Sequence, residues 1–176
     1  LREIESVRDN LLTFDNIVVE PERRMNGGNA ATLITDLSEE TYEIRITIER
    51  AQAERKRFGF YLFANQERQG LTLIIKPETG TLRLGGSEAP FRVEDLPVGK
   101  DIELCIFLDK YLVEVFINGC QAMIAAHIDW QSSKGFYAYS FGGATVIQRV
   151  DIWELKSTNQ GYLDAKINRV WEIDEK

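Results

Sequence analysis

Residues 101–126, DIELCIFLDKYLVEVFINGCQAMIAA, decide the fold of this chain. Apolar and polar side chains alternate along most of this stretch, and a period of two is typical of β-strands with one buried face. Asp109-Lys110 predicts a two-residue turn, and Asn118-Gly119 is the strongest short hairpin signal in the chain. The stretch therefore predicts three antiparallel strands joined as a meander, at 101–108, 112–117 and 120–126.

The two turns also predict which side chains share a face. As two-residue turns, they place Leu108 opposite Tyr111 and Ile117 opposite Cys120. One face of the meander then becomes almost wholly apolar, and we expect it to be the core face. Its members are Leu104, Ile106, Leu108, Val113, Val115, Ile117, Cys120, Ala122 and Ile124.

The opposite face of the meander mixes large apolar side chains with acidic ones. Its members are Glu103, Cys105, Phe107, Leu112, Glu114, Phe116, Gln121, Met123 and His127. A solvent face would carry fewer large apolar groups, so we expect another surface to cover this one. The cover is either a loop of the same domain or another domain or subunit. The expected interface residues are Phe107, Leu112, Glu114, Phe116 and Met123.

Short alternating runs continue along the rest of the chain. They include residues 42–48, 58–63, 71–75, 136–141 and 144–155, with Gly and Pro between many of them. Many short strands at close spacing predict an all-β fold, a two-sheet antiparallel β-sandwich of the concanavalin or lectin-like jelly-roll type. We expect one domain over residues 1–157, and residues 158–176 as a C-terminal tail or an extra strand of that domain.

Composition excludes several classes of function. The 176 residues carry a formal net charge of −7, which disfavours nucleic acid and anionic membrane surfaces as partners. One His and two Cys are too few for a structural zinc site, and no phosphate-binding loop motif is present, so no metal and no cofactor is expected. No disulfide is expected either, because Cys105 and Cys120 point to opposite sides of the predicted sheet.

The start of the sequence bears on its origin. No run approaches the roughly 18 apolar residues of a membrane helix, and residues 1–5 lack the layout of a secretion signal. The chain does not begin with Met. We expect it to be a piece of a longer polypeptide.

Three segments resemble a known family. Phe107 to Lys110 followed by Val113 to Gly119 resembles the C-terminal β-sandwich of glycoside hydrolase family 32, the invertases, levanases, inulinases and sucrose-phosphate hydrolases. Trp153 to Ser157 is similar to the closing strand of that domain, and Glu3 to Arg8 to the segment that leads into it. Tyr111-Leu112 departs from the small hydroxyl residues that are common in the family.

The resemblance implies a module without a catalytic site. The family hydrolyses fructosyl bonds on a preceding five-bladed propeller, with Asn-Asp-Pro, Arg-Asp-Pro and Glu-Cys motifs. None of these occurs here, because the four prolines follow Glu20, Lys76, Ala89 and Leu96, and no Cys follows Glu. We therefore expect no catalytic residue. The expected role is packing on the catalytic propeller, or on a second subunit, of a fructan- or sucrose-hydrolysing enzyme.

Residue types leave weaker alternatives open. Glu103 and Glu114 are the best candidates for the two carboxyl groups of a glycosidase, which must lie about 5 Å apart in a retaining enzyme. His127 and Asp129 lie near Ser132 and Ser133, but no nucleophile-elbow motif surrounds these serines.

Aromatic side chains favour a second function, that of a lectin-like carbohydrate-binding module acting on its own. Flat rings can pack on the CH-rich faces of an oligosaccharide, and core packing is the alternative use of such rings. The candidate rings are Trp130, Tyr137, Tyr139, Tyr111 and Trp171.

Overall fold

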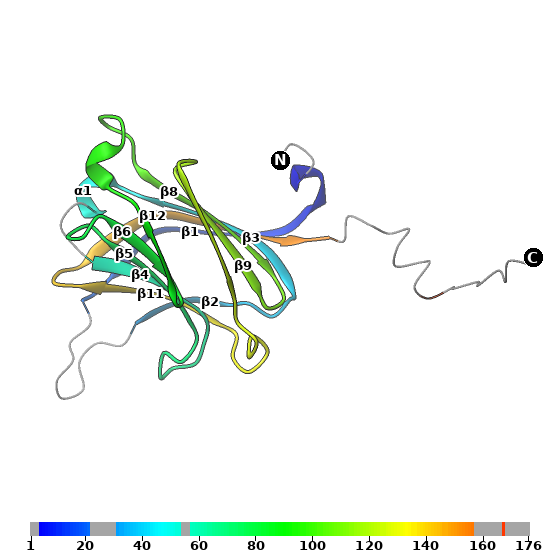
Figure 1. The fold of residues 1–176 in the computed structure, drawn as a ribbon. Coiled ribbons are helices and arrows are strands. Elements are labelled where there is room, and N and C mark those ends of the chain that lie inside the picture. Colours follow the sequence, from blue (N-terminus) through cyan, green and yellow to red (C-terminus); the bar gives the residue numbers. More distant parts are fainter. Residues whose placement is uncertain (1–3, 22–30, 54–56, 157–166, 168–176) are drawn as a thin grey trace, which may run out of the picture.

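The protein consists of two six-stranded antiparallel sheets packed face to face, and the expected all-β sandwich is confirmed. The computed structural model describes residues 4–21, 31–53, 57–156 and 167. Figure 1 shows the two layers. In spatial order, sheet A contains β1 (Arg8–Val19), β12 (Thr145–Leu155), β3 (Thr41–Ile48), β8 (Ile102–Asp109), β9 (Leu112–Ile117) and β10 (Gln121–Ala126). Sheet B contains β2 (Thr32–Asp36), β11 (Gly135–Phe141), β4 (Arg57–Ala64), β5 (Leu71–Lys76), β6 (Thr81–Leu84) and β7 (Ser87–Pro90).

Helical segments are short and lie outside the two sheets. They are η1 (Ile4–Val7), α1 (Arg50–Ala53) and η2 (Val93–Asp95). No described helix is long and apolar enough to cross a membrane. The predicted tail at 158–176 lies outside the described residues except for position 167.

The core fills the space between the two sheets. Ile44 and Ile46 of sheet A, and Phe58, Phe60 and Leu73 of sheet B, are all at most 2% exposed. Burial of a side chain of this size contributes roughly 1.5–3 kcal/mol relative to leaving it in water. The alternating pattern of the sequence thus supplies the inner faces of both sheets.

The turn between β8 and β9 lies one residue later than expected. Lys110 and Tyr111 form it, and Lys110 takes a positive φ of 54°. Leu108 consequently pairs with Val113 rather than with Tyr111. This shifts the pairing by two positions, which is one full period of a strand, so the predicted faces of β8 and β9 are unchanged.

The turn between β9 and β10 corrects the prediction for β10. Asn118 and Gly119 take the positive φ values of 49° and 64° that a type I′ turn requires, and the Cys120 N–H donates to the Ile117 carbonyl oxygen at 3.0 Å. Cys120 is nevertheless an extra residue, because Ile117 pairs with Gln121. A shift of one position exchanges the two faces of every following residue.

The exchange moves several side chains from their expected places. Met123 and Ala125 pack against the core, whereas Ala122 and Ile124 point outward and Ile124 is 56% exposed. Cys120, Ala122 and Ile124 are therefore not core residues, and Met123 does not belong to the outer face. Gln121 also turns inward, and its side chain donates to the Pro90 carbonyl of β7 at 3.2 Å.

This register makes a testable distinction between two neighbouring residues. We expect Ile124→Lys to change the free energy of unfolding by no more than about 0.5 kcal/mol, because the new ammonium group stays in water. We expect Met123→Lys to cost about 2 kcal/mol or more, because it buries a charge against the core. Urea denaturation of both variants measures the difference, and a larger loss for Ile124→Lys would contradict the observed register.

Candidate functional site

The outer face of sheet A is the candidate site, and it has two unlike halves. Strands β1, β12 and β3 carry mostly charged side chains on this face, and strands β8, β9 and β10 carry mostly apolar ones. The charged half includes Arg8, Asp15, Glu43, Arg45, Arg149 and Asp151, with Trp153 among them. The apolar half includes Cys105, Phe107, Leu112, Phe116, Ala122, Ile124 and Ala126, with Glu103 and Glu114.

A buried carboxylate organises the charged half. Glu43 of β3 is 0% exposed although it points to the outer side of the sheet. Arg8 donates to it with two nitrogens: Nε to Oε2 at 2.7 Å and Nη2 to Oε1 at 2.7 Å. Arg45 Nε adds a third hydrogen bond to Oε1 at 2.8 Å. The Arg8 guanidinium also lies 4.5 Å from the centre of the Trp153 ring. The arginine fork and the indole together exclude water from the carboxylate.

The surroundings keep this network ionised. Burial alone would raise the pKa of Glu43, but the hydrogen bonds from Arg8 and Arg45 outweigh burial and hold that pKa below its usual value. The hydrogen bond to Glu43 in turn raises the pKa of Arg8. Burial, together with the Glu43 charge, raises the pKa of the Cys105 thiol, whose Sγ lies 3.9 Å from Glu43 Oε1. Cys105 is therefore a protonated, unreactive thiol at neutral pH.

Two phenylalanines mark the apolar half. The rings of Phe107 and Phe116 meet edge to face with their centres 6.0 Å apart. Phe116 is 38% exposed, Leu112 is half-buried and Glu114 is exposed. Large apolar groups therefore face outward on this half, and an interface here stays a prediction.

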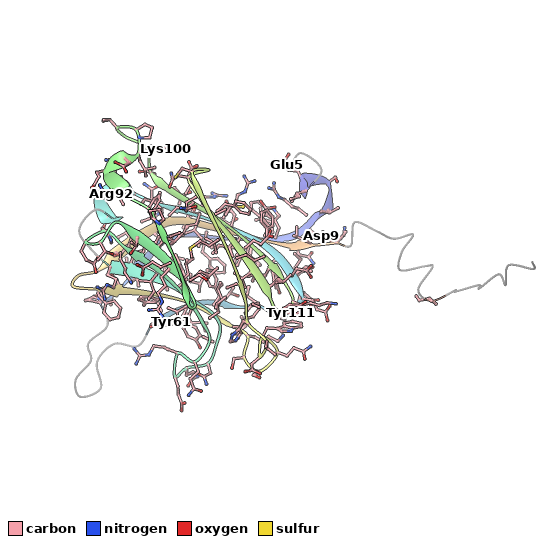
Figure 2. All side chains as sticks on the ribbon, viewed as in Figure 1. Glu5, Asp9, Tyr61, Arg92, Lys100 and Tyr111 are labelled. Atoms are coloured by element: carbon pink, nitrogen blue, oxygen red, sulfur yellow. The ribbon has the colours of Figure 1, made fainter. Side chains whose placement is uncertain are left out.

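A groove of about 510 Å³ runs between the two halves. One wall is formed by Ile4 of η1 and by Arg8, and the other by the Asn118-Gly119 turn. The floor includes Arg45, Cys105 and the two phenylalanine rings. In Figure 2, Glu5 of η1 and Lys100 of the loop before β8 rise at opposite ends of this face. The groove is large enough for one or two side chains of a partner or for a small ligand.

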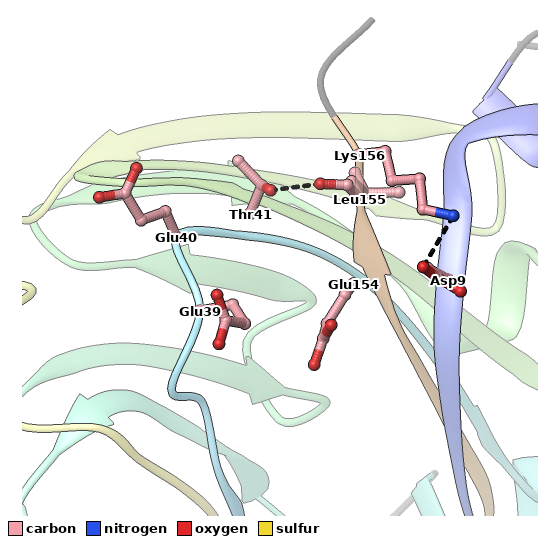
Figure 3. Close-up of a pocket in the computed structure, with 7 residues that line it drawn as sticks. All are labelled: Asp9, Glu39, Glu40, Thr41, Glu154, Leu155 and Lys156. Carbon is pink, nitrogen blue, oxygen red and sulfur yellow. Dashed lines mark hydrogen bonds and ion pairs between the residues drawn. The ribbon is translucent and has the colours of Figure 1, made fainter.

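A second, acidic hollow of about 310 Å³ lies where β1 and β12 meet the β2–β3 loop (Figure 3). Lys156 Nζ lies 2.8 Å from an Asp9 carboxylate oxygen, and the Thr41 hydroxyl donates to the Leu155 carbonyl at 2.7 Å. Glu39, Glu40 and Glu154 complete the lining. Among the described residues, no group of three or more His, Cys, Asp or Glu is arranged to hold a metal ion.

A glycosidase general acid needs a carboxyl group whose pKa is raised. Among the described residues, five carboxyl groups have a pKa that departs from its usual value, and in each of them it is lowered: Asp9, Glu43, Glu78, Glu88 and Asp151.

The two carboxylates proposed from the sequence as an acid pair lie far apart. Glu114 pairs across the strands with Phe107, which is four residues from Glu103, or roughly 13 Å along β8. Glu103 also forms an ion pair with Lys100 at 2.6 Å. The separation exceeds that of both retaining and inverting glycosidases.

The His127 ring is part of a packed cluster. It stacks on Phe63 of β4, with ring centres 5.9 Å apart. Burial lowers the pKa of His127, against the charge of Asp129. No described hydrogen bond joins this ring to Ser132 or Ser133, so the arrangement is that of a packing residue.

The candidate sugar-binding rings lie in three separate places. Trp130 is 8% exposed, meets Phe63 edge-on and lies 4.7 Å from Lys134 Nζ. Tyr139 is 2% exposed and donates from its hydroxyl to the Leu73 carbonyl at 3.1 Å. Its ring covers Gly59, where an added Cβ would lie 2.7 Å from the Tyr139 hydroxyl oxygen.

The other two described rings are more accessible. Tyr137 is half-buried on the outer face of sheet B, and Tyr111 is 48% exposed in the β8–β9 turn. Trp171 lies outside the described residues. Sugar binding by these rings stays a prediction.

The sequence did not reveal the Glu43 network. Glu43 alternates with isoleucines on β3, a pattern that favours a solvent-facing position rather than a buried one. Its partner Arg8 is 35 positions away, in the segment that resembles the family's approach to the sandwich. That resemblance was the only available signal.

The fold and this face define a β-sandwich module with a partly apolar outer sheet face. The chain belongs to the C-terminal domain of glycosyl hydrolases family 32, whose family model matches residues 3–154. The resemblance found in the sequence is thereby confirmed.

Individual relatives are longer than this chain. It is 24% identical over 172 residues to the levanase of Bacillus subtilis (strain 168), covering 89% of the chain and 24% of that protein. Its fold is similar to part of the exo-inulinase from Aspergillus awamori, with a TM-score of 0.66, 18% identity, and coverage of 88% of this chain and 31% of that one. For the sucrose-6-phosphate hydrolase from Lactobacillus gasseri the TM-score is 0.59, the identity 16%, and the coverage 89% and 30%. The chain thus spans about a quarter to a third of these relatives.

The buried network predicts a specific loss of stability. Removing one partner of a buried ion pair costs about 3–5 kcal/mol, and we expect Glu43→Gln to fall at the lower end because Arg8 keeps some contact with water. The control Glu114→Gln changes an exposed carboxyl on the same face and is expected to stay within about 0.5 kcal/mol of the parent. Denaturant unfolding compares the two variants, and equal losses would contradict a stabilising role for Glu43.

The same network predicts a pH dependence. A carboxyl whose pKa is lower in the folded than in the unfolded chain stabilises the fold above its unfolded pKa, and the contribution disappears as the pH falls through the folded pKa. We therefore expect the stability difference between the parent chain and Glu43→Gln to shrink as the pH falls below about 4.3. Urea titrations at a series of pH values measure it, and a difference that grows on acidification would contradict the assignment.

Proposed function

We propose that this chain is a non-catalytic module of a glycoside hydrolase that acts on fructans or sucrose. In this proposal it packs on the catalytic β-propeller, or on a neighbouring subunit, and stabilises the enzyme. The observation that carries the proposal is the apolar half of the outer face of sheet A in a chain of this family.

The absence of catalysis is supported by sequence and geometry together. The Asp-Pro and Glu-Cys pairs of the family's catalytic motifs do not occur in the sequence. Glu103 and Glu114 are too far apart for acid–base work, and the described carboxyl groups with shifted pKa values are all more acidic than usual.

Packing on a partner is supported by the outward-facing residues themselves. Phe107, Leu112 and Phe116 point outward on β8 and β9, and Ile124 points outward on the neighbouring β10. Glu114 stands among them as a polar contact. An outer sheet face of this kind is typical of surfaces that bind another protein surface.

The substrate class of the parent enzyme rests on its relatives. They are named as a levanase, an exo-inulinase and a sucrose-6-phosphate hydrolase, and the chain covers only part of each. All three names denote hydrolases of fructose-containing sugars, so we place the parent enzyme in that class.

An activity assay tests the non-catalytic role. We expect the chain at micromolar concentration to release no fructose from sucrose, levan or inulin, because it lacks a paired acid and nucleophile. A polypeptide that joins the chain to its catalytic domain should release fructose under the same conditions. Measurable turnover by the chain alone, retained after purification by two independent methods, would contradict the proposal.

A further inference from the structure

We infer that the groove between η1 and the β9–β10 turn is a socket for a segment of the domain that precedes this module in the same polypeptide. The segment presents an apolar or aromatic side chain to Phe107 and Phe116, and a hydrogen-bond acceptor to Arg45. This inference rests on the proposed function, because it names the surface and the partner of the proposed packing.

The chemistry of the groove fits such a segment. The edge-to-face rings of Phe107 and Phe116 provide an apolar floor, and Phe116 remains 38% exposed. The Arg45 side chain is 52% exposed at the same floor while its Nε is held by Glu43. An apolar group with an adjacent carbonyl or carboxylate oxygen satisfies both features at once.

The course of the backbone favours a preceding domain as the occupant. Ile4 of η1 forms part of the groove wall, so the polypeptide reaches β1 along the outer face of sheet A. Any domain joined to the N-terminal side of η1 is therefore tethered on this side of the sandwich.

The segment that leads into the sandwich, η1 and the first residues of β1, is held by several contacts and is called the approach segment below. The Lys156 N–H donates to the Val7 carbonyl at 2.9 Å, and Lys156 Nζ pairs with Asp9 at 2.8 Å. Arg8 is clamped by the two hydrogen bonds to Glu43. These contacts fix one wall of the groove before any partner arrives, which lowers the entropic cost of docking.

Three of the charged groups on this face, Glu43, Arg8 and Asp151, require little additional desolvation when a partner covers them. Glu43 is already 0% exposed and the Arg8 side chain only 14% exposed, and both are already paired. The Asp151 side chain is 15% exposed and accepts hydrogen bonds from Thr13 and Arg149. A partner surface therefore meets charges that are already neutralised.

Charge and patch size argue against a second copy of the chain. Two copies would each carry a net charge of −7 and would repel one another. A tethered domain, in contrast, acts at an effective concentration in the millimolar range for a short linker, so a small apolar surface is sufficient.

Hydroxyl-radical footprinting with mass spectrometry tests the inference. The oxidation rates of Phe116 and Leu33 are compared between the chain alone and a polypeptide in which it follows its catalytic domain. Leu33 is the matched control, because it is 49% exposed and lies on β2 of the other sheet. We expect oxidation of Phe116 to fall several-fold in the longer polypeptide and that of Leu33 to stay unchanged.

The other outcomes separate this inference from the proposed function. Protection of Leu33 without Phe116, or equal protection of both, overturns the socket and leaves packing on the catalytic domain standing. No protection of either residue overturns both proposals. Protection of Phe116 in the chain alone by sucrose or a levan oligosaccharide would assign the groove to a sugar and overturn the socket.

A pair of variants makes the test independent of folding. In the chain alone, both variants should still unfold in one cooperative transition, Leu33→Asp at nearly the parent's denaturant concentration and Phe116→Asp slightly below it, because only Phe116 loses a ring contact, with Phe107. In the longer polypeptide, Phe116→Asp should speed proteolytic cleavage between the two domains several-fold, whereas Leu33→Asp should not. Equal cleavage rates for the two variants would overturn the inference.

Discussion

Successive side chains of a β-strand point to opposite faces, so a single extra residue in a turn exchanges the faces of all that follow. This constraint determines which side chains lie on the outer face of sheet A. Cys120 is the extra residue here, and it turns Met123 toward the core and Ile124 toward the outside. The outer face of β10 becomes a row of small or branched apolar groups, which extends the apolar surface of Phe107 and Phe116.

In the charged half of the same face, the arrangement is determined by the hydrogen bonds to one buried carboxylate. A carboxylate without water is costly unless its hydrogen bonds are made, and Glu43 receives three of them from Arg8 and Arg45. The network joins the start of β1 to the middle of the sheet, so it orients the approach segment as well as satisfying the charge. With Arg149, Asp15 and Asp151, the charged half carries three positive and three negative side chains, so it presents no net charge to a docking surface.

In the proposed function, the module contributes to an enzyme through its surfaces rather than through reactive groups. Among the described residues, the core lies between the two sheets, and the apolar side chains on the outer face of sheet A are not part of it. Trp130 and Tyr139, two of the rings predicted from the sequence to bind sugar, are largely buried by contacts within the module. The groove beside η1, in contrast, is lined by the Phe107 and Phe116 rings and by the half-exposed guanidinium of Arg45.

The sequence by itself determined the all-β sandwich, the family, and the inner and outer faces of β8 and β9. Alternation and tight turns are local properties of the sequence. The error in the position of the turn at Lys110 left the predicted faces of β8 and β9 correct, because it shifted the pairing by an even number of residues. Only the tertiary structure decided the faces of β10 and the burial of Glu43. The faces of β10 depend on Cys120, and the Asn118-Gly119 turn signal is the same whether or not Cys120 is an extra residue in the turn. The burial of Glu43 depends on Arg8 and Trp153, which lie on strands distant in the sequence. A local sequence pattern carries no information about such long-range contacts.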